Sequence, residues 1–185
     1  MTGKKIAVAV SGGVDSGVAL MLLKEQGYDP IAVYCDHFEC LMTDTQKACC
    51  SIDSLRRARE TAEYLQVPFY RINLIKEFKE QITQPFIEYY QKGLTPNPCV
   101  WCNSRIRFSI LTNKLRGMGY EYFATGHYAK TIGGRLFLAA DILKDQTYFL
   151  NAVNRKVLEK VIFPLENKLK EETCSIARQK GLPVM

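Results

Sequence analysis

Near the amino terminus the sequence reads Ile6-Ala7-Val8-Ala9-Val10-Ser11-Gly12-Gly13-Val14-Asp15-Ser16. Five successive apolar residues without polar alternation are typical of a strand that is buried on both faces, as in a parallel sheet. Residues 17–26 then predict a helix, which Gly27 closes. The stretch therefore predicts a strand, a glycine-rich loop and a helix, the unit from which parallel α/β folds are built.

The loop at residues 11–16 predicts a phosphate site. Backbone N–H groups at the start of a helix, together with the positive end of the helix dipole, favour an anion there. Gly12 and Gly13 let the backbone approach phosphate oxygens closely, and Ser11 and Ser16 add hydroxyl donors. The loop lacks the Gly-Lys-Ser/Thr ending of a P-loop and the Gly-x-Gly-x-x-Gly pattern of dinucleotide folds. The alternative is an ordinary glycine-rich turn in which Asp15 or Ser16 caps the helix.

Apolar runs and helical periodicities alternate along the rest of the chain. Further strands are expected at 30–34, 67–72, 120–125 and 136–139, and helices at 51–65, 78–93, 104–118, 154–162 and 170–180. This alternation predicts an α/β fold with a doubly wound parallel sheet, helices on both faces, and ligands at the carboxyl ends of the strands. We predict a nucleotide-binding domain over residues 1–150. Residues 151–185 would form a helical extension, the start of a following domain that is absent.

Composition limits the class of protein. A chain of 185 residues with 47% hydrophobic content can bury its own core. No stretch approaches the roughly 18 apolar residues of a membrane helix, so we expect a cytoplasmic protein with no membrane partner. Seven cysteines, an odd number, favour reduced thiols, metal ligation or redox chemistry over a disulfide framework. The net charge of +6 is compatible with a polyanionic partner but does not require one.

A second chemical motif reads Thr95-Pro96-Asn97-Pro98-Cys99-Val100-Trp101-Cys102-Asn103. The two prolines restrict the backbone and present both thiols on a defined loop before a helix. The helix start and the nearby Arg105 and Arg107 favour the thiolate form. A Cys-x-x-Cys pair fits half of a zinc site, a redox dithiol or cluster ligands, and simple packing of both thiols is the alternative.

Five motifs occur in the same order as in one known family. They are residues 11–16, Thr95-Pro96-Asn97-Pro98 with Cys102-Asn103, and residues 124–129, 144–150 and 163–165. On these motifs the chain resembles the tRNA-specific 2-thiouridylases along essentially its whole length, and its first loop looks like the PP-loop of the N-type ATP pyrophosphatases. The resemblance implies that O2 of a wobble uracil attacks the α-phosphate of ATP, and that a cysteine persulfide then displaces AMP. The implied cofactors and partners are ATP with Mg²⁺, a tRNA and a sulfur-donor protein.

The resemblance also implies roles for individual residues. Cys102 matches the first catalytic cysteine of the family, and we predict catalytic roles for Cys99 and Asp15 as well. The residues predicted to bind ATP are Ala9, Val10, Ser11, Gly12, Gly13, Val14, Asp15, Ser16, Cys35, Gly126 and His127. Those predicted to contact tRNA are Asn97, Pro98, Cys99, Lys144, Asp145 and Gln146. For His127, a nucleotide contact and a buried structural histidine are both open.

The sequence departs from the family pattern in two ways. Relatives continue into a segment with a second catalytic cysteine, which Cys174 does not replace, so the chain is either a truncated form or a short natural relative. Many relatives also have an acidic residue where this chain has Cys99. Cys99 either forms a disulfide with Cys102 after sulfur release or shares a [4Fe-4S] cluster with it. A third cluster ligand would come from Cys49 or Cys50, with Cys40 as a further candidate.

Two other functions stay open. One is a PP-loop ATP pyrophosphatase that acts on a small molecule, and the other is a non-catalytic nucleotide-binding or sulfur-relay module. Trp101 is expected either to stack on a base or to anchor the loop. Seven basic residues are expected either to face RNA or to form solvated helix surfaces: Arg56, Arg57, Arg59, Arg105, Arg107, Lys114 and Arg116.

Overall fold

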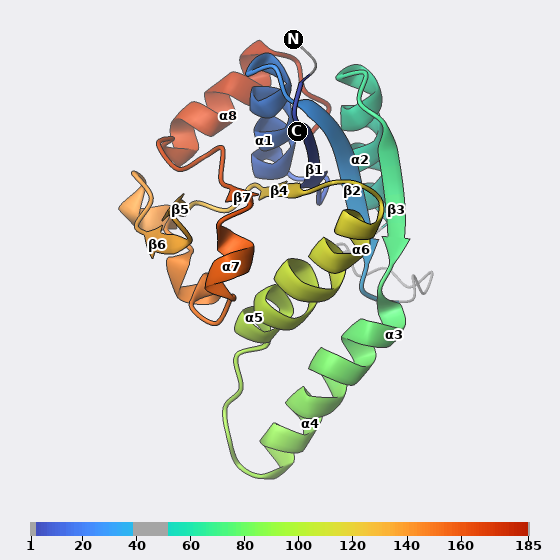
Figure 1. Ribbon diagram of the computed structural model, residues 1–185, viewed down its shortest axis with the longest axis vertical. Coiled ribbons are helices and arrows are strands. Elements are labelled where there is room, and N and C mark those ends of the chain that lie inside the picture. Colours follow the sequence, from blue (N-terminus) through green and yellow to red (C-terminus); the bar gives the residue numbers. More distant parts are fainter. Residues whose placement is uncertain (1–2, 39–51, 185) are drawn as a thin grey trace.

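The computed structural model describes residues 3–38 and 52–184, and its centre is a five-stranded sheet (Figure 1). The strand order is β3-β2-β1-β4-β7, and every neighbouring pair is parallel. The strands are β1 (Lys5–Ala9), β2 (Asp29–Asp36), β3 (Phe69–Asn73), β4 (Tyr122–Thr125) and β7 (Val161–Ile162). The chain moves outward from β1 to β3 and then returns to the other side of β1. This arrangement confirms the predicted α/β fold, and it places the topological switch point between β1 and β4.

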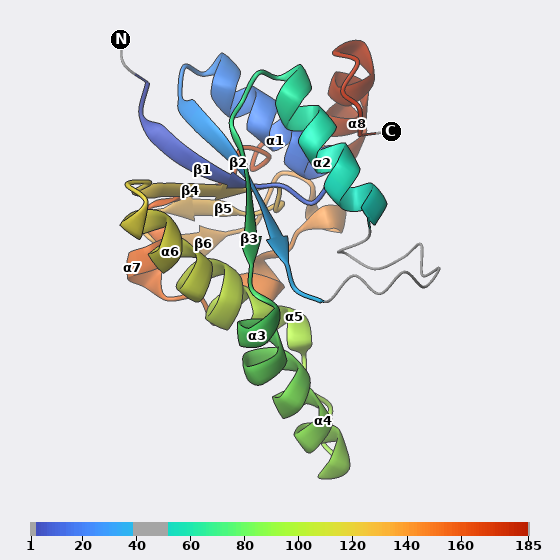
Figure 2. The same ribbon diagram turned by 90° about the vertical axis from the view of Figure 1, so that its right-hand side faces the viewer.

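Helices cover both faces of the sheet (Figure 2). On one side lie α1 (Val14–Glu25) and α2 (Ile52–Tyr64), with α8 (Lys170–Gln179) packed against α1. On the other side a continuous helix is formed by α5 (Pro98–Trp101), the π-helical η2 (Cys102–Leu111) and α6 (Thr112–Gly117), with a kink at Phe108. The short helix α7 (Arg155–Leu158) and two 3₁₀ turns, η3 (Ile142–Lys144) and η4 (Thr147–Leu150), follow on this side.

The core follows from the alternation of side chains along the strands. On β1, Ile6 and Val8 pack with α1 and α2, whereas Ala7 joins Phe108 and Leu111 in the cluster on the opposite face. Each fully buried side chain of this size contributes roughly 1.5–3 kcal/mol. Helix α1 is apolar on two sides because it lies between the sheet and α8, which explains why its sequence shows little amphipathic pattern.

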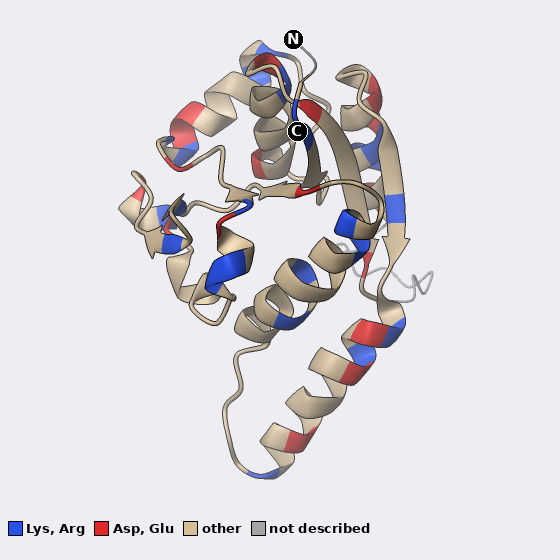
Figure 3. Ribbon diagram, in the orientation of Figure 1, with Lys and Arg blue, Asp and Glu red and all other residues tan. Residues whose placement is uncertain are grey.

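A helical arm projects from the sheet domain (Figures 1 and 2). It consists of α3 (Ile75–Phe78), the π-helical η1 (Lys79–Thr83) and α4 (Gln84–Gln91), which confirms most of the helix predicted at 78–93. Pro85 lacks an N–H donor, and the wider turns of η1 directly before it accommodate the lost hydrogen bond. Acidic and basic residues are interspersed along the arm (Figure 3). None of the helices in the described ranges is long and apolar enough to cross a membrane.

The structure corrects two predictions after residue 130. The helix predicted at 154–162 is only the single turn α7, because Val161 and Ile162 instead add β7 to the edge of the sheet. The strand predicted at 136–139 is β6 (Arg135–Phe137), and it pairs antiparallel with β5 (Lys130–Ile132), which was not predicted. The division of the chain at residue 150 stays a prediction; the segment after it supplies β7 to the sheet and α8 to the surface of α1.

Candidate functional site

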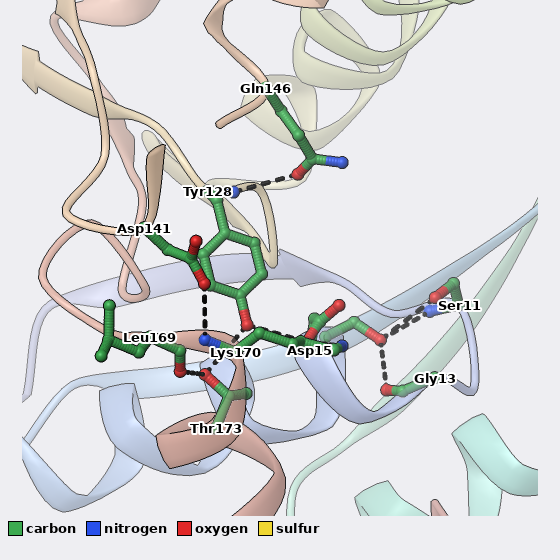
Figure 4. A network of polar contacts seen from close by, with 10 residues as sticks. Ser11, Gly13, Asp15, Tyr128, Asp141, Gln146, Leu169, Lys170 and Thr173 are labelled. Atoms are coloured by element: carbon green, nitrogen blue, oxygen red, sulfur yellow. Dashed lines mark hydrogen bonds and ion pairs between the residues drawn. The ribbon is translucent and has the colours of Figure 1, made fainter. Parts of the chain in front are cut away.

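The loop at residues 11–16 is held in shape by its own side chains. Ser16 Oγ accepts a hydrogen bond from Ser11 N at 3.1 Å and donates one to Gly13 O at 3.0 Å (Figure 4). Gly12 has a φ of +74°, which favours glycine, and its carbonyl accepts a hydrogen bond from Arg57 Nε on α2 at 3.0 Å. These hydrogen bonds fix the conformation of the loop.

Two glycines allow other backbone segments to approach this loop closely. A Cβ at Gly12 would lie 2.1 Å from Ser54 O, at the start of α2. A Cβ at Gly126, just after β4, would lie 2.7 Å from Asp15 C and from Ser16 N. Both distances are far below any real Cβ contact, so the loop, α2 and the end of β4 fit together only with glycine at these positions.

A cavity of about 240 Å³ opens beside the loop, at the carboxyl ends of β1, β2 and β4. Among the residues predicted to bind ATP, its walls contain Ala9, Val10, Ser11, Asp15, Ser16, Cys35, Gly126 and His127. Gly12, Gly13 and Val14 belong to the loop but do not line the cavity. The remaining lining residues, which were not predicted to bind ATP, are Val33, Tyr34, His37, Leu74, Ile106, Arg107, Leu111, Thr125 and Gln146. The cavity lies at the switch point of the sheet, where α/β folds bind their ligands.

His127 is held as a neutral ring in the wall of this cavity. Its Nδ1 lies 2.7 Å from Thr125 Oγ1, and its Nε2 lies 3.5 Å from Arg107 Nη1. A guanidinium only donates, so Nε2 accepts and Nδ1 carries the proton toward Thr125. Burial, followed by the charge of Arg107, lowers the pKa of His127 to about 3. Burial and the same guanidinium lower the pKa of His37 to about 4, against a smaller opposing effect of Asp36.

These two lowered pKa values predict an acid-sensitive fold. Between pH 6.5 and about 4 the unfolded chain binds more protons at His37 and His127 than the folded chain does. The free energy of unfolding should therefore be highest above pH 6.5 and fall as the pH is lowered through this window. Urea unfolding at pH 7, 6 and 5 should show this slope, and it should be shallower in His37→Asn and His127→Asn. Equal slopes in all three proteins would contradict the assignment, because the chain contains only these two histidines.

The thiol motif forms the start of the helix that walls the cavity. Asn97 Oδ1 accepts hydrogen bonds from Cys99 N at 3.1 Å and Val100 N at 3.3 Å, so Asn97 caps this helix. Cys99 is an exposed free thiol, whereas Cys102 is half-buried against the core. Ile106 lines the cavity and lies four residues after Cys102 in the π-helical η2, which is roughly one helical turn. The helix thus carries both Cys102 and part of the cavity wall.

Asn103 ties this helix to Phe149, three residues after the segment 144–146 that is predicted to contact tRNA. Its Nδ2 donates to Phe149 O at 3.1 Å, and its Oδ1 accepts from Arg107 Nη1 at 3.0 Å. Within the predicted segment, Asp145 accepts hydrogen bonds from Ala139 N and Thr147 N and so organises its own loop. Lys144 is exposed, and Gln146 lines the cavity while its Oε1 accepts from Tyr128 N at 3.0 Å. Pro98 occupies the first turn of α5. A tRNA-binding role for this segment and for 97–99 stays a prediction.

The predicted basic residues do not form one common surface. Those on α2 and those on the α5-η2-α6 helix lie on opposite faces of the sheet (Figure 2). Most are engaged locally: Arg56 pairs with Glu60, Lys114 pairs with Glu77, and Arg59 lies over the Phe69 ring. Arg105 lies 4.7 Å from the centre of the Trp101 ring, and Trp101 also packs against Tyr89 at 5.0 Å, which favours the loop-anchoring role for Trp101.

The structure describes Cys99 and Cys102 but not the other cysteines that are candidate cluster ligands. Cys40, Cys49 and Cys50 lie outside the described residues. Within residues 3–38 and 52–184, no group of three or more His, Cys, Asp or Glu side chains is arranged to hold a metal ion. The pairing of Cys99 and Cys102 in a cluster therefore has no third ligand in the part of the chain that is described.

Sequence reasoning missed Arg107 as part of the cavity wall and Lys170 as a partner of the loop. The sequence indicates only that Arg107 belongs to a helix, and nothing in it predicts that the guanidinium lies 3.5 Å from His127 Nε2. Lys170 lies 155 residues from Asp15, yet its Nζ is 2.6 Å from Asp15 Oδ1. No local sequence pattern predicts an ion pair between residues that are so far apart along the chain.

Comparison with known proteins identifies relatives over the whole chain. A model of the family described as the tRNA methyl transferase HUP domain matches residues 4–185. The chain is 44% identical over 191 aligned positions to the tRNA-specific 2-thiouridylase MnmA of Leptospira interrogans, covering 100% of this chain and 51% of that protein. It is 38% identical to the protein of the same name from Thermus thermophilus, covering 97% and 51%.

Solved structures share the fold at much lower identity. A predicted subunit of tRNA methyltransferase from Methanocaldococcus jannaschii has a TM-score of 0.56 at 18% identity, covering 95% of this chain and 74% of that chain. The glutamine-dependent NAD⁺ synthetase of Acinetobacter baumannii, solved with ADP, has a TM-score of 0.55 at 16% identity, covering 96% and 28%. At these identities the likeness establishes the fold alone.

Proposed function

Because this chain belongs to the family of the tRNA methyl transferase HUP domain, we propose that it is the ATP-using part of a tRNA 2-thiouridylase. The chain spans about half the length of the curated relatives it matches, so the activity of those relatives enters here as a proposal. The proposed reaction activates O2 of a wobble uridine as an adenylate and replaces it with sulfur.

One observation carries the proposal: a single helix supplies both a wall of the cavity and the thiol motif. Ile106 and Arg107 line the cavity, and Cys102 lies one turn before them. A base activated at the mouth of the cavity would therefore meet a sulfur within about one helical turn. An enzyme that only adenylates a small molecule has no need of a thiol at this place.

The residues of the cavity suit the first half-reaction. Backbone N–H groups of residues 12–16, which include the start of α1, would stabilise the pyrophosphate as it leaves. Magnesium bound with ATP would neutralise further phosphate charge, and Asp15 is the carboxylate in the cavity wall that would hold it. His127 contributes no positive charge above about pH 4, so Arg107 is the cation that faces the nucleotide from the opposite wall.

The two cysteines of the motif suit the second half-reaction. The terminal sulfur of a persulfide on Cys102 would attack C2 of the adenylated base, and AMP would leave. The Cys99 thiolate would then attack the Cys102 sulfur, releasing the thiolated base and leaving a Cys99–Cys102 disulfide. A sulfur-donor protein and a reductant would restore the persulfide. We propose this dithiol role because Cys99 and Cys102 are enough for it, whereas a [4Fe-4S] cluster needs a further thiol, and its candidates Cys40, Cys49 and Cys50 lie outside the described residues.

ATP–pyrophosphate exchange tests the proposal. We expect the chain to catalyse exchange only when an unmodified tRNA with a wobble uridine is present, because the base is the nucleophile. The matched control is the same transcript with cytidine at the wobble position, which should support no exchange. Retention of the tRNA should weaken steeply with salt, since several phosphates are neutralised on binding. Exchange that is independent of tRNA would overturn the proposal in favour of a small-molecule substrate.

A further inference from the structure

Helices α1 and α8 are joined by two ion pairs with identical spacing. Lys170 Nζ lies 2.6 Å from Asp15 Oδ1, and Lys180 Nζ lies 2.8 Å from Glu25 Oε1. The two acids are ten residues apart on α1, and the two lysines are ten residues apart along α8 and its C-terminal cap. The helices therefore run side by side in the same direction (Figure 1). Only the first ion pair reaches the cavity, because Asp15 lines it and Glu25 does not.

The Asp15 carboxylate is held by groups from two distant segments (Figure 4). Besides Lys170, the Tyr128 hydroxyl donates to the same Oδ1 at 3.1 Å. That hydroxyl also lies 3.0 Å from Thr173 Oγ1 on α8. Burial is the main reason that the pKa of Tyr128 is raised above its usual value, so the phenol keeps its proton. Oδ2 of Asp15 has no partner among the described residues, so Oδ1 is the anchored oxygen of the carboxylate.

The place of Lys170 is unfavourable for the helix itself. It is the first residue of α8, where the helix dipole is positive and a cation is disfavoured. The Asp15 carboxylate compensates the positive charge of the Lys170 side chain. Asp141 Oδ2 accepts a hydrogen bond from the backbone N of Lys170 at 2.8 Å. The side chains of Lys170 and Asp15 are 33% and 35% exposed, so their attraction is only partly screened by solvent. The charge of Lys170 is thus favourable for Asp15 in the loop at residues 11–16 and unfavourable for α8.

We propose that Lys170 is a positioning residue of the phosphate site, which neutralises Asp15 so that a polyanion can enter beside this carboxylate. This inference rests on the proposed phosphate-binding role of the loop. Lys170 does not line the cavity, so it acts through Asp15 rather than on the phosphates. Without the lysine, an unpaired carboxylate faces the incoming anion. With it, the charge of the carboxylate is balanced and its orientation is fixed.

Calorimetric titration with inorganic pyrophosphate in EDTA tests the role of Lys170 without any metal or tRNA. We expect Lys170→Met to weaken pyrophosphate binding about tenfold, as expected for an unbalanced charge a few ångströms from the ligand. Lys170→Arg should retain most of the affinity. The double variant Asp15→Asn/Lys170→Met should bind pyrophosphate more tightly than Lys170→Met does, since the repulsion is gone. Lys180→Met removes the matched ion pair of α8 and should leave the affinity unchanged.

Four results would overturn the inference. An unchanged affinity in Lys170→Met would show that the lysine has no role at the site. A double variant as weak as Lys170→Met would mean that Lys170 contacts the phosphates itself. A similar loss in Lys180→Met would assign the effect to the packing of α8 on α1. If the unmodified chain bound no pyrophosphate, the phosphate-loop assignment would fail, and this inference with it.

Discussion

Gly12→Ala is expected to lower the affinity for ATP by about 100-fold or more, which corresponds to a loss of roughly 2.7 kcal/mol in binding free energy. The added Cβ would lie 2.1 Å from Ser54 O, so either the loop or the start of α2 must move. The φ of +74° adds the cost of a left-handed conformation for a residue other than glycine, of the order of 1–2 kcal/mol. Calorimetric titration with ATP measures the loss, and circular dichroism should report a fold that is retained.

Gly13→Ala is the matched control for this prediction. A Cβ at Gly13 would meet only Ser11 Oγ, at 3.5 Å, and the φ of −99° is open to any residue. Its affinity for ATP should stay within about fivefold of the unmodified chain, since no backbone segment has to move. Wild-type affinity in Gly12→Ala, or an equal loss in both variants, would contradict the view that the approach of Ser54 shapes the loop.

Cys102→Ala is expected to remove sulfur transfer by a factor of about 1,000 or more, while tRNA-dependent ATP–pyrophosphate exchange stays near the wild-type rate. The reason is the order of the proposed steps, since the thiol acts only after the base is adenylated. Transfer of labelled sulfur from a persulfide donor to tRNA measures the second step separately from the exchange reaction.

Two further variants define what the loss in Cys102→Ala means. Cys99→Ala should allow one attack on the adenylated base but block release, so a Cys102–tRNA adduct should accumulate and be cleaved by added thiol. Cys174→Ala, which removes a half-buried free thiol on α8, should leave both steps unchanged. Loss of the exchange reaction in Cys102→Ala would make this cysteine structural or a ligand of a cluster that is needed for activation.

The sheet could be predicted from the sequence because its central strands are unusually clear. Residues 6–10 and 30–34 are apolar without interruption, and glycine ends the helix between them. Strand β7 could not be predicted, because two apolar residues within a helix-like pattern do not reveal that the edge of β4 is free to pair with them. The strand predicted at 136–139 is confirmed only for residues 136 and 137, because β6 ends at Phe137 and the chain then turns so that Ala140 N donates to Glu166 O.

The candidate site was predictable where local sequence determines local shape. The loop at 11–16 and the Asn97 cap both follow from residues that are neighbours in the chain. Arg107 and Lys170 could not be found in this way, because each meets its partner only after the chain has folded back across the sheet. The hydrogen bonds of Asp145 to its own loop could not be predicted from the motif either, and its contact with tRNA stays a prediction.

The helix from Pro98 to Gly117 fixes the distance between the thiol of Cys102 and the wall of the cavity. Cys102 and Ile106 both belong to η2 and precede the kink at Phe108, so the geometry of this one segment sets the distance between them. An insertion of one residue between them would rotate the sulfur by roughly a quarter of a turn about the helix axis. An insertion of the same length at the exposed turn around Gly93, where an added Cβ would meet nothing within 4 Å, would leave this helix unchanged. Length variation among homologous chains should therefore be tolerated at that turn and excluded from residues 102–106.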